Sequence, residues 1–433
     1  MKKIILSLSL ALLWLISSAQ TTELQEYLNK LEGVEFVKID SGEKFNEFYE
    51  LLITQPLDHK NPDKGSFKQR VFLSLKCKRR PVVLVTEGYN AHRAVRPDYT
   101  TELTRILDAN QIFVEHRYFG KSLPEDMDYQ YLTIENAAND HHRVVELFKP
   151  FFKAKWVNTG ISKGGQTAMY HRYFFPNDVD ASVPYVGPLM FSKEDERFYD
   201  HLNNIGTKKC RKDIHNFQKL MLKNKEELLP KFIEGNKAKG YTYRKGYEHG
   251  YEYMVLEYSF AFWQWGSACA SIPDKTVGMD SVYKHWEKIV GYGYLAEPKT
   301  KDGFSFMVQA MTDFGYYGYD VSEFKRLLDV VKKHDYDFVL PEGVELIYKP
   351  ELMQKVKRFL QTKGDRMLYI YGEVDPYTSQ AVELTGECDA VKYVLEGGSH
   401  STRIRNFPKD VQEEMFKKLE AWLDVDITYE FPK

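Results

Sequence analysis

The chain has 433 residues, which is long enough for one large domain with an insertion or for two domains. The formal net charge is -2, whereas nucleic-acid-binding proteins are typically basic, so we expect no nucleic-acid partner. Its four cysteines are too few for a disulfide scaffold, and their spacings match no zinc site, so the sequence predicts no metal.

The first 19 residues have the three parts of a Sec signal peptide. Two lysines follow Met1, residues 4–16 form an apolar run, and a Ser-Ser-Ala cleavage site precedes Gln20. The run is too short and wrongly flanked for a membrane span. We therefore expect export by a bacterium to the periplasm or the outside, with no stable membrane insertion after cleavage.

The next 170 residues predict a sheet wrapped by helices. Residues 48–55 and 67–75 read as an antiparallel hairpin, because turn-forming residues separate them. Short, continuous apolar runs at 81–86 and 111–115 are typical of strands buried on both faces. Further strands at 155–159 and 181–186, with helical stretches between them, indicate a mostly parallel sheet.

The pattern changes at about residue 190. Lys- and Glu-rich amphipathic segments, 212–233 and 321–334, replace the buried-strand pattern, which resumes only at 366–371 and 391–395. We interpret the middle section as a helical cap inserted into the sheet domain. The predicted division is a signal peptide at 1–19, an α/β domain in two parts at 20–189 and 361–433, and a helical cap at 190–360.

A G-x-S-x-G pentapeptide, residues 160–164, lies between a predicted strand and a predicted helix. This context is that of a nucleophile elbow, a sharp turn that exposes a serine hydroxyl. Ser162 is therefore the predicted nucleophile, and the expected fold is that of the α/β-hydrolases: a mostly parallel sheet with helices on both faces and an inserted cap.

A serine hydroxyl needs an imidazole to remove its proton and a carboxylate to orient that imidazole. Asp375 and His400 each follow a predicted strand at its carboxyl end, where open α/β sheets place their sites. The order Ser162, Asp375, His400 is that of α/β-hydrolase triads. Glu373 is the alternative acid. The predicted mechanism requires no cofactor.

A tetrahedral intermediate also needs two hydrogen-bond donors where negative charge develops. We expect one to be the backbone N–H of Lys163, directly after the nucleophile. The second is expected from the loop after the strand ending at Thr86, where we choose the N–H of Tyr89. The side chain of Lys163 is interpreted as a surface or ion-pair group.

Several segments carry a family resemblance over residues 45 to 433. The segment at 115–124 (EHRYFGKSLP) resembles a loop of the secreted prolyl serine peptidases, which include lysosomal Pro-X carboxypeptidase and its dipeptidyl-peptidase relatives. The segment at 312–317 (TDFGYY) resembles their TEFGYY cap segment, with Asp313 in place of Glu. The elbow at 160–167 (GISKGGQT), TEGYN at 86–90 and GSH at 398–400 are closer to the secreted prolyl tri/tetrapeptidyl aminopeptidases.

This resemblance implies an exported serine exopeptidase that releases short peptides, tripeptides or similar units, from free N-termini, with proline favoured at P1. A proline pocket needs aromatic walls, and Trp263 and Trp265 in the aromatic run at 258–265 are candidates, with cap core as the alternative interpretation. A carboxylate must anchor the α-ammonium group. The candidates are Glu87, Glu115 and Asp313, and the sequence does not rank them.

Two other functions remain open at this point. One is an esterase or lipase with the same triad, and the other is a catalytically silent hydrolase fold that binds carbohydrate or peptide. The oligomeric state is open as well. Among the cysteines, Cys210 and Cys269 are the pair to test for a disulfide in an oxidising compartment, with free buried thiols as the alternative.

Overall fold

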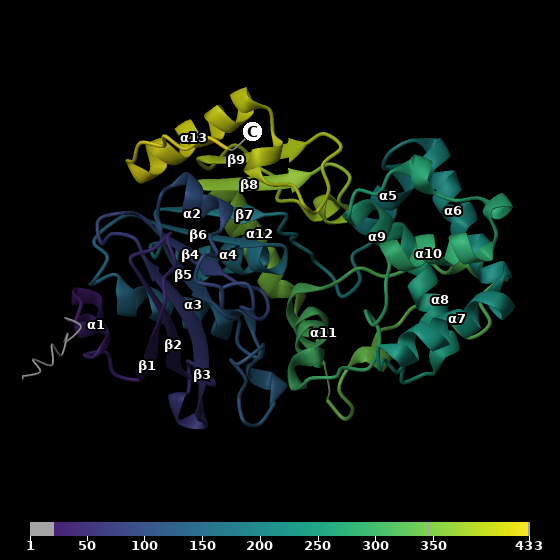
Figure 1. The fold of residues 1–433 in the computed structure, drawn as a ribbon, viewed down its shortest axis with the longest axis horizontal. Helices are drawn as coiled ribbons and strands as arrows, with labels where there is room; N and C mark the ends of the chain where they lie inside the picture. Colours follow the sequence, from purple (N-terminus) through teal and green to yellow (C-terminus); the bar gives the residue numbers. More distant parts are fainter. Residues whose placement is uncertain (1–20, 345, 432–433) are drawn as a thin grey trace, which may run out of the picture.

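A computed structural model describes residues 21–344 and 346–431 (Figure 1). The predicted signal peptide lies outside these residues. The described part contains a nine-stranded sheet in the order β1-β2-β3-β5-β4-β6-β7-β8-β9. The strands are β1 (Val34–Ile39), β2 (Glu47–Pro56), β3 (Ser66–Leu75), β4 (Val82–Thr86), β5 (Asn110–Val114), β6 (Trp156–Ile161), β7 (Ala181–Tyr185), β8 (Met367–Gly372) and β9 (Ala390–Leu395).

The predicted antiparallel hairpin is confirmed as β2 and β3, which pair along their whole length from Glu47↔Leu75 to Pro56↔Ser66. β1 pairs with β2 and β3 pairs with β5, both antiparallel. All pairs from β5 through β4, β6, β7 and β8 to β9 are parallel. The sheet is therefore mostly parallel, as predicted, and the carboxyl ends of its parallel strands share one edge.

Helices cover both faces of this sheet. Successive residues of a strand point to opposite faces, and in β4 the residues on both faces are apolar. Val82 and Leu84 of β4 pack in one cluster with α3 (Ile134–Phe148) and α1 (Glu23–Leu28). Val83 and Val85 pack in another cluster with α2 (Glu102–Ile106) and the terminal helix α13 (Lys409–Leu423). Helix α4 (Lys163–Phe174) contacts α3. Strands buried on both faces explain the continuous apolar runs of the sequence.

Residues between β7 and β8 form the helical insertion (Figure 1). Helices α5 to α10 make a separate lobe beside the sheet, and α12 returns to pack against α4. The helices are α5 (Arg197–Asn204), α6 (Lys208–Lys223), α7 (Lys225–Ala238), α8 (Tyr247–Leu256), α9 (Tyr258–Gln264), α10 (Met279–Ile289), α11 (Ser305–Gln309) and α12 (Pro350–Thr362). The mostly parallel sheet, helices on both faces and this insertion form the α/β-hydrolase fold.

The amphipathic segment at 321–334 is not a helix, and this corrects the sequence-based interpretation. Only residues 322–324 form a short 3-10 turn. The carboxylate of Glu252 accepts hydrogen bonds from the backbone N–H groups of Asp329, Val330 and Val331, at 2.6 to 3.4 Å. A helix would need those N–H groups for its own carbonyls, so the buried carboxylate holds the segment in a different conformation. Among the described helices, none is long and apolar enough to cross a membrane.

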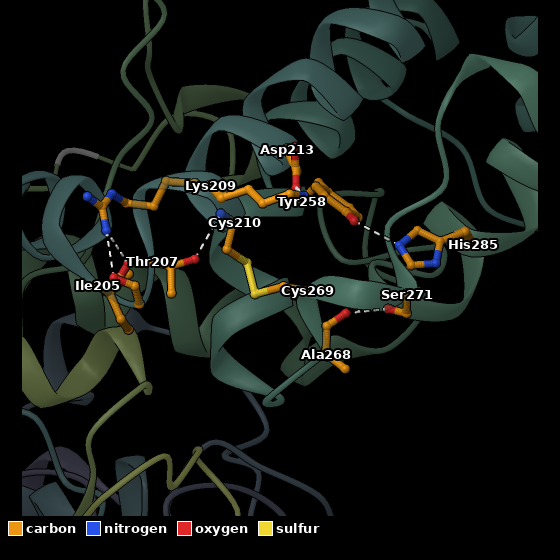
Figure 2. The surroundings of a disulfide bond; sticks show 12 residues. Ile205, Thr207, Lys209, Cys210, Asp213, Tyr258, Ala268, Cys269, Ser271 and His285 are labelled. Carbon is orange, nitrogen blue, oxygen red and sulfur yellow. Dashed lines mark hydrogen bonds and ion pairs between the residues drawn. A yellow bond between two sulfur atoms is a disulfide. The ribbon is translucent and has the colours of Figure 1, made fainter.

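A disulfide joins Cys210, in the first turn of α6, to Cys269, which follows α9 (Figure 2). The two Cα atoms are 5.4 Å apart, and the bridge spans 59 positions of sequence. Beside the bridge, the hydroxyl of Thr207 accepts the N–H of Cys210 at 3.1 Å and caps α6. Cys77 is exposed and free, and Cys388 is half-buried and free.

Replacing Cys210 and Cys269 together by serine should lower the free energy of unfolding by about 2–4 kcal/mol, because the bridge restricts a long loop of the unfolded chain. Guanidinium unfolding, followed by tryptophan fluorescence and circular dichroism, measures the loss. Cys77→Ser is the matched control and should leave the midpoint unchanged. Equal stability of the double variant and the wild-type chain would contradict this expectation.

Candidate active site

Ser162 lies at the turn from β6 into α4, where the sequence predicts the nucleophile elbow. Its backbone has φ 58° and ψ -121°, in the left-handed half of conformational space that residues with a Cβ rarely adopt. Such a conformation costs about 1–3 kcal/mol and persists only where surrounding contacts fix it. The N–H of Ser162 donates to the carbonyl of Tyr185 in β7 at 2.9 Å. The neighbouring strand thus helps to hold the turn.

Two glycines allow the backbones around the elbow to meet. A Cβ on Gly160 would lie 2.1 Å from the carbonyl oxygen of Gly164, so only glycine lets β6 approach α4 this closely. A Cβ on Gly88 would lie 2.7 Å from the backbone nitrogen of Gly164. Gly88 belongs to the loop after β4, and this loop therefore packs directly against the first turn of α4.

Asp375 and His400 meet at the carboxyl ends of β8 and β9. Nδ1 of His400 lies 2.6 Å from Oδ2 of the fully buried Asp375. The other carboxylate oxygen of Asp375 accepts the N–H of Tyr377 at 3.1 Å, which fixes the orientation of the carboxylate. A hydrogen bond at Nδ1 leaves Nε2 as the ring atom available to a hydroxyl group. Glu373, the alternative acid, instead accepts the N–H of Gly397 at 2.8 Å.

The end of α9, in the helical insertion, contacts the loop that carries His400. The N–H of His400 donates to the carbonyl of Gln264, the last residue of α9, at 2.9 Å. The ring of Trp265 stands edge-on to the imidazole with centroids 5.9 Å apart, and the ring of Tyr377 lies 5.2 Å from it. The inserted segment therefore forms part of the wall around His400.

Ser162 and His400 line one cavity of about 950 Å³, which is large enough for a short peptide. Its walls include aromatic rings and charged groups of both signs. The aromatic residues include Tyr89, Tyr99, Phe119, Trp265 and Phe306, and the charged ones include Glu87, Arg93, Glu102, Asp302 and Arg403. The predicted site residues Glu87, Tyr89, Ser162, Trp265 and His400 thus come together at this cavity.

Both expected oxyanion donors lie at the elbow. Lys163 is the first residue of α4, where backbone N–H groups have no partner within the helix and the helix dipole favours negative charge. Tyr89 follows Gly88 in the loop packed against that turn. Burial raises the pKa of the Glu87 carboxyl, and the N–H groups of Gly88 and Tyr89 oppose this rise, as do Arg93 and Lys163. The N–H of Gly88 donates to the carboxylate of Glu87 at 3.0 Å.

The side chain of Lys163 is not a surface or ion-pair group, which corrects the interpretation from sequence. The residue is only 3% exposed, and its Nζ donates to the carbonyl of Gly88 at 2.7 Å. Burial lowers the pKa of its amine to about 7, and the carboxylates of Glu87 and Asp313 oppose this shift. Sequence position alone does not show this burial, because it results from the packing of the β4 loop on α4.

Two of the three candidate anchor carboxylates are occupied elsewhere. The carboxylate of Glu115 accepts from the N–H groups of Ala91, Lys121 and Ser122 and from the guanidinium of Arg70, so it organises its own loop. Asp313 accepts the N–H of Ile134 at the start of α3, at 2.9 Å. Burial raises the pKa of Asp313 to about 6, and the N–H of Ile134, Lys349 and Lys163 oppose the rise.

Trp263 and Trp265 lie in different places, although both are predicted as pocket walls. Trp263 lies in the last turn of α9, whereas Trp265 follows the end of that helix. Trp265 lines the cavity of Ser162 and is 56% exposed. Trp263 is buried and lines a second cavity of about 530 Å³ within the cap. Asp302 lines the Ser162 cavity from the cap, and the sequence carries no motif around it that would single it out.

The family model described as PS-10 peptidase S37 matches residues 19–426. The prolyl tri/tetrapeptidyl aminopeptidase of Streptomyces mobaraensis is 30% identical over 419 residues, which cover 94% of this chain and 86% of that protein. "Probable serine protease EDA2" of Arabidopsis thaliana is 24% identical over 40% of this chain and 39% of its own length. Among solved structures, proline iminopeptidase of Mycobacterium smegmatis is 13% identical, with a TM-score of 0.42 over 86% of this chain and 98% of that one.

The resemblance inferred from the elbow and loop motifs is confirmed by these matches. The family model spans most of the sequence, including the elbow, the segment after β8 and the histidine loop. The chain belongs to the PS-10 peptidase S37 family.

Proposed function

We propose that the chain is an exported serine exopeptidase that releases short peptides from free N-termini, with proline preferred at P1. The observation that carries the proposal is the single cavity lined by Ser162 and His400, with Asp375 2.6 Å behind the imidazole, in a chain of a peptidase family. The similarity to a protein named prolyl tri/tetrapeptidyl aminopeptidase supports the choice of substrate.

The proposed mechanism uses three side chains. The hydroxyl of Ser162 attacks the scissile carbonyl while Nε2 of His400 takes its proton, and Asp375 keeps the imidazole in the required tautomer. The N–H groups of Lys163 and Tyr89 stabilise the oxyanion. His400 then donates the proton to the leaving amine, and an acyl-enzyme remains. Water, deprotonated by His400, attacks the acyl group, and the bond to Ser162 breaks as His400 returns the proton to the serine oxygen, which releases the short peptide.

The proline preference is supported by the walls of the cavity. Proline presents a flat, apolar ring with no N–H to satisfy, which suits contact with aromatic faces. Tyr89 and Phe306 are stacked with centroids 5.7 Å apart, and Trp265 stands beside His400. The exclusion of folded proteins is supported by the inserted segment, which contacts His400 through Gln264 and contributes Trp265 and Phe306 to the cavity wall. We propose that the released peptide is three residues long.

Fluorophosphonate should label Ser162 in the wild-type chain and leave Ser162→Ala unlabelled. In a P1-scanned library of peptides with free N-termini, proline should give the highest kcat/KM, and mass spectrometry should identify tripeptide products. Acetylation of the N-terminus should remove the turnover. Unchanged turnover of acetylated peptides would contradict the aminopeptidase proposal. Hydrolysis of esters without any peptide turnover would favour an esterase. A wild-type chain that fluorophosphonate does not label would indicate a catalytically silent fold.

We also propose that Glu87 binds the α-ammonium group, since it is the one predicted anchor that lines the cavity. A charge-assisted hydrogen bond is worth about 1.5–3 kcal/mol, so Glu87→Gln should raise KM for free-N-terminal peptides about 10- to 100-fold. Ester substrates without an amino group serve as the control and should be unaffected. Asp302→Asn is the comparison variant. A selective KM effect in Asp302→Asn, absent in Glu87→Gln, would transfer the anchor to Asp302.

Export is proposed from the signal-like residues 1–19. The disulfide between Cys210 and Cys269 supports this location, because such bridges persist in oxidising compartments. Expression of the full chain in a bacterial host should yield a periplasmic or extracellular protein whose N-terminus, by mass spectrometry, is Gln20. An intact Met1 on protein confined to the cytoplasm would contradict the proposal.

A further inference from the structure

The elbow contains a buried amine that the proposed mechanism does not use. Lys163 is 3% exposed, and its Nζ lies over the rings of Phe119, Tyr89 and Phe314, with distances to their centroids of 5.0, 5.6 and 5.9 Å. An ammonium group is strongly hydrated, so its removal from water is costly unless it is paired. A buried lysine directly after the nucleophile therefore needs a reason.

The hydrogen bond of this amine has a defined target. Nζ donates to the carbonyl of Gly88 at 2.7 Å. That carbonyl and the N–H of Tyr89 belong to the same peptide unit, which is planar and trans, so the two groups point in opposite directions. A lysine that holds the carbonyl of Gly88 on one side therefore fixes the N–H of Tyr89 on the other.

The surroundings support this arrangement. The absence of a side chain on Gly88 lets its peptide unit lie against Lys163 and Gly164, where a Cβ would come within 2.7 Å of atoms of both residues. Tyr89 and Glu87 line the cavity that Ser162 and His400 also line, so this peptide unit lies at the edge of that cavity. A hydrogen-bond donor on a carbonyl also polarises the peptide unit and strengthens its N–H as a donor.

We propose that Lys163 is a positioning residue of the oxyanion site: its backbone N–H supplies one donor, and its side chain, through the carbonyl of Gly88, orients the N–H of Tyr89 as the second. The proposal rests on the proposed serine chemistry of Ser162. It adds a role for a side chain that acts through the carbonyl of Gly88.

A small cavity is lined in part by Lys163. A cavity of about 10 Å³, close to the volume that one water molecule requires, is lined by Lys163, Tyr170 and Gln309. The hydroxyl of Tyr170 and Oε1 of Gln309 are buried and have no hydrogen-bond partner among the described residues. One water in this space would accept from the amine of Lys163 and serve both of these groups.

Lys163→Met tests the proposal, because methionine has similar length and lacks the donor. With p-nitrophenyl acetate and with a prolyl peptide, kcat should fall about 10²- to 10³-fold, as for loss of one oxyanion donor, while KM changes little. A peptide aldehyde, whose adduct with Ser162 carries an oxyanion, should lose affinity by a similar factor, and a product peptide should keep its affinity. The melting temperature should change little, because the removal of a buried amine offsets the loss of its hydrogen bond to the carbonyl of Gly88.

Lys121→Met is the control, since Lys121 is an exposed lysine that pairs with Glu50. It should retain the wild-type kcat and the affinity for the aldehyde. Wild-type kcat in Lys163→Met would overturn the proposal. So would an equal loss of aldehyde and product binding with a lower melting temperature, because these changes would indicate packing alone.

Amine rescue provides a second variant and a separate readout. Ethylammonium should restore kcat in Lys163→Ala in a concentration-dependent manner, whereas tetramethylammonium, which has charge but no N–H, should not. Equal rescue by both ions, or rescue by neither, would overturn the role of the hydrogen bond. Fluorophosphonate labelling of the wild-type chain separates the two proposals: a chain that is not labelled refutes the serine chemistry itself, whereas labelling with an unaffected Lys163→Met refutes only the positioning role.

Discussion

The close approach of three backbone segments at Ser162 is the constraint on which the rest of the site depends. β6, the first turn of α4 and the loop after β4 meet at distances that exclude a Cβ on Gly160 and on Gly88. This contact holds the left-handed backbone of Ser162, whose strain would otherwise relax. It also places the start of helix α4, whose first N–H groups have no partner within the helix, beside Ser162. The rest of the sheet can be regarded as the rigid frame that keeps these segments together.

The inserted helices act on the site through few contacts. The carbonyl of Gln264 accepts the N–H of His400, and Trp265 stands beside the imidazole, so the end of α9 helps to fix the histidine loop. The disulfide between Cys210 and Cys269 ties the segment just beyond α9 to the start of α6. The disulfide and the hydrogen bond between Gln264 and His400 therefore connect the imidazole of His400 to the helical insertion. The same wall of the cavity thus helps to position the imidazole of His400.

The buried ionisable side chains of this protein differ in how completely they are paired. Arg117 and Asp140, both fully buried, form two hydrogen bonds of 2.7 Å that connect the loop after β5 to α3. That pair is satisfied and orders the scaffold. Lys163 and Glu87 are less completely paired. Burial lowers the pKa of the Lys163 amine and raises the pKa of the Glu87 carboxyl, and both shifts favour the neutral form. Strongly shifted pKa values beside a cleft are more common at functional than at structural positions.

The sequence by itself determined the elements whose signals are local. Continuous apolar runs identified the buried strands, the pentapeptide identified the elbow, and the order Ser162, Asp375, His400 followed from strand ends. Tertiary structure decided what depends on contacts between distant segments. Glu252 removed the N–H donors that a helix at 321–334 would need, and Glu115 and Asp313 found backbone partners away from the cavity. Lys163 became a buried donor to Gly88 because the β4 loop covers it, a contact between residues 75 positions apart that no local pattern records.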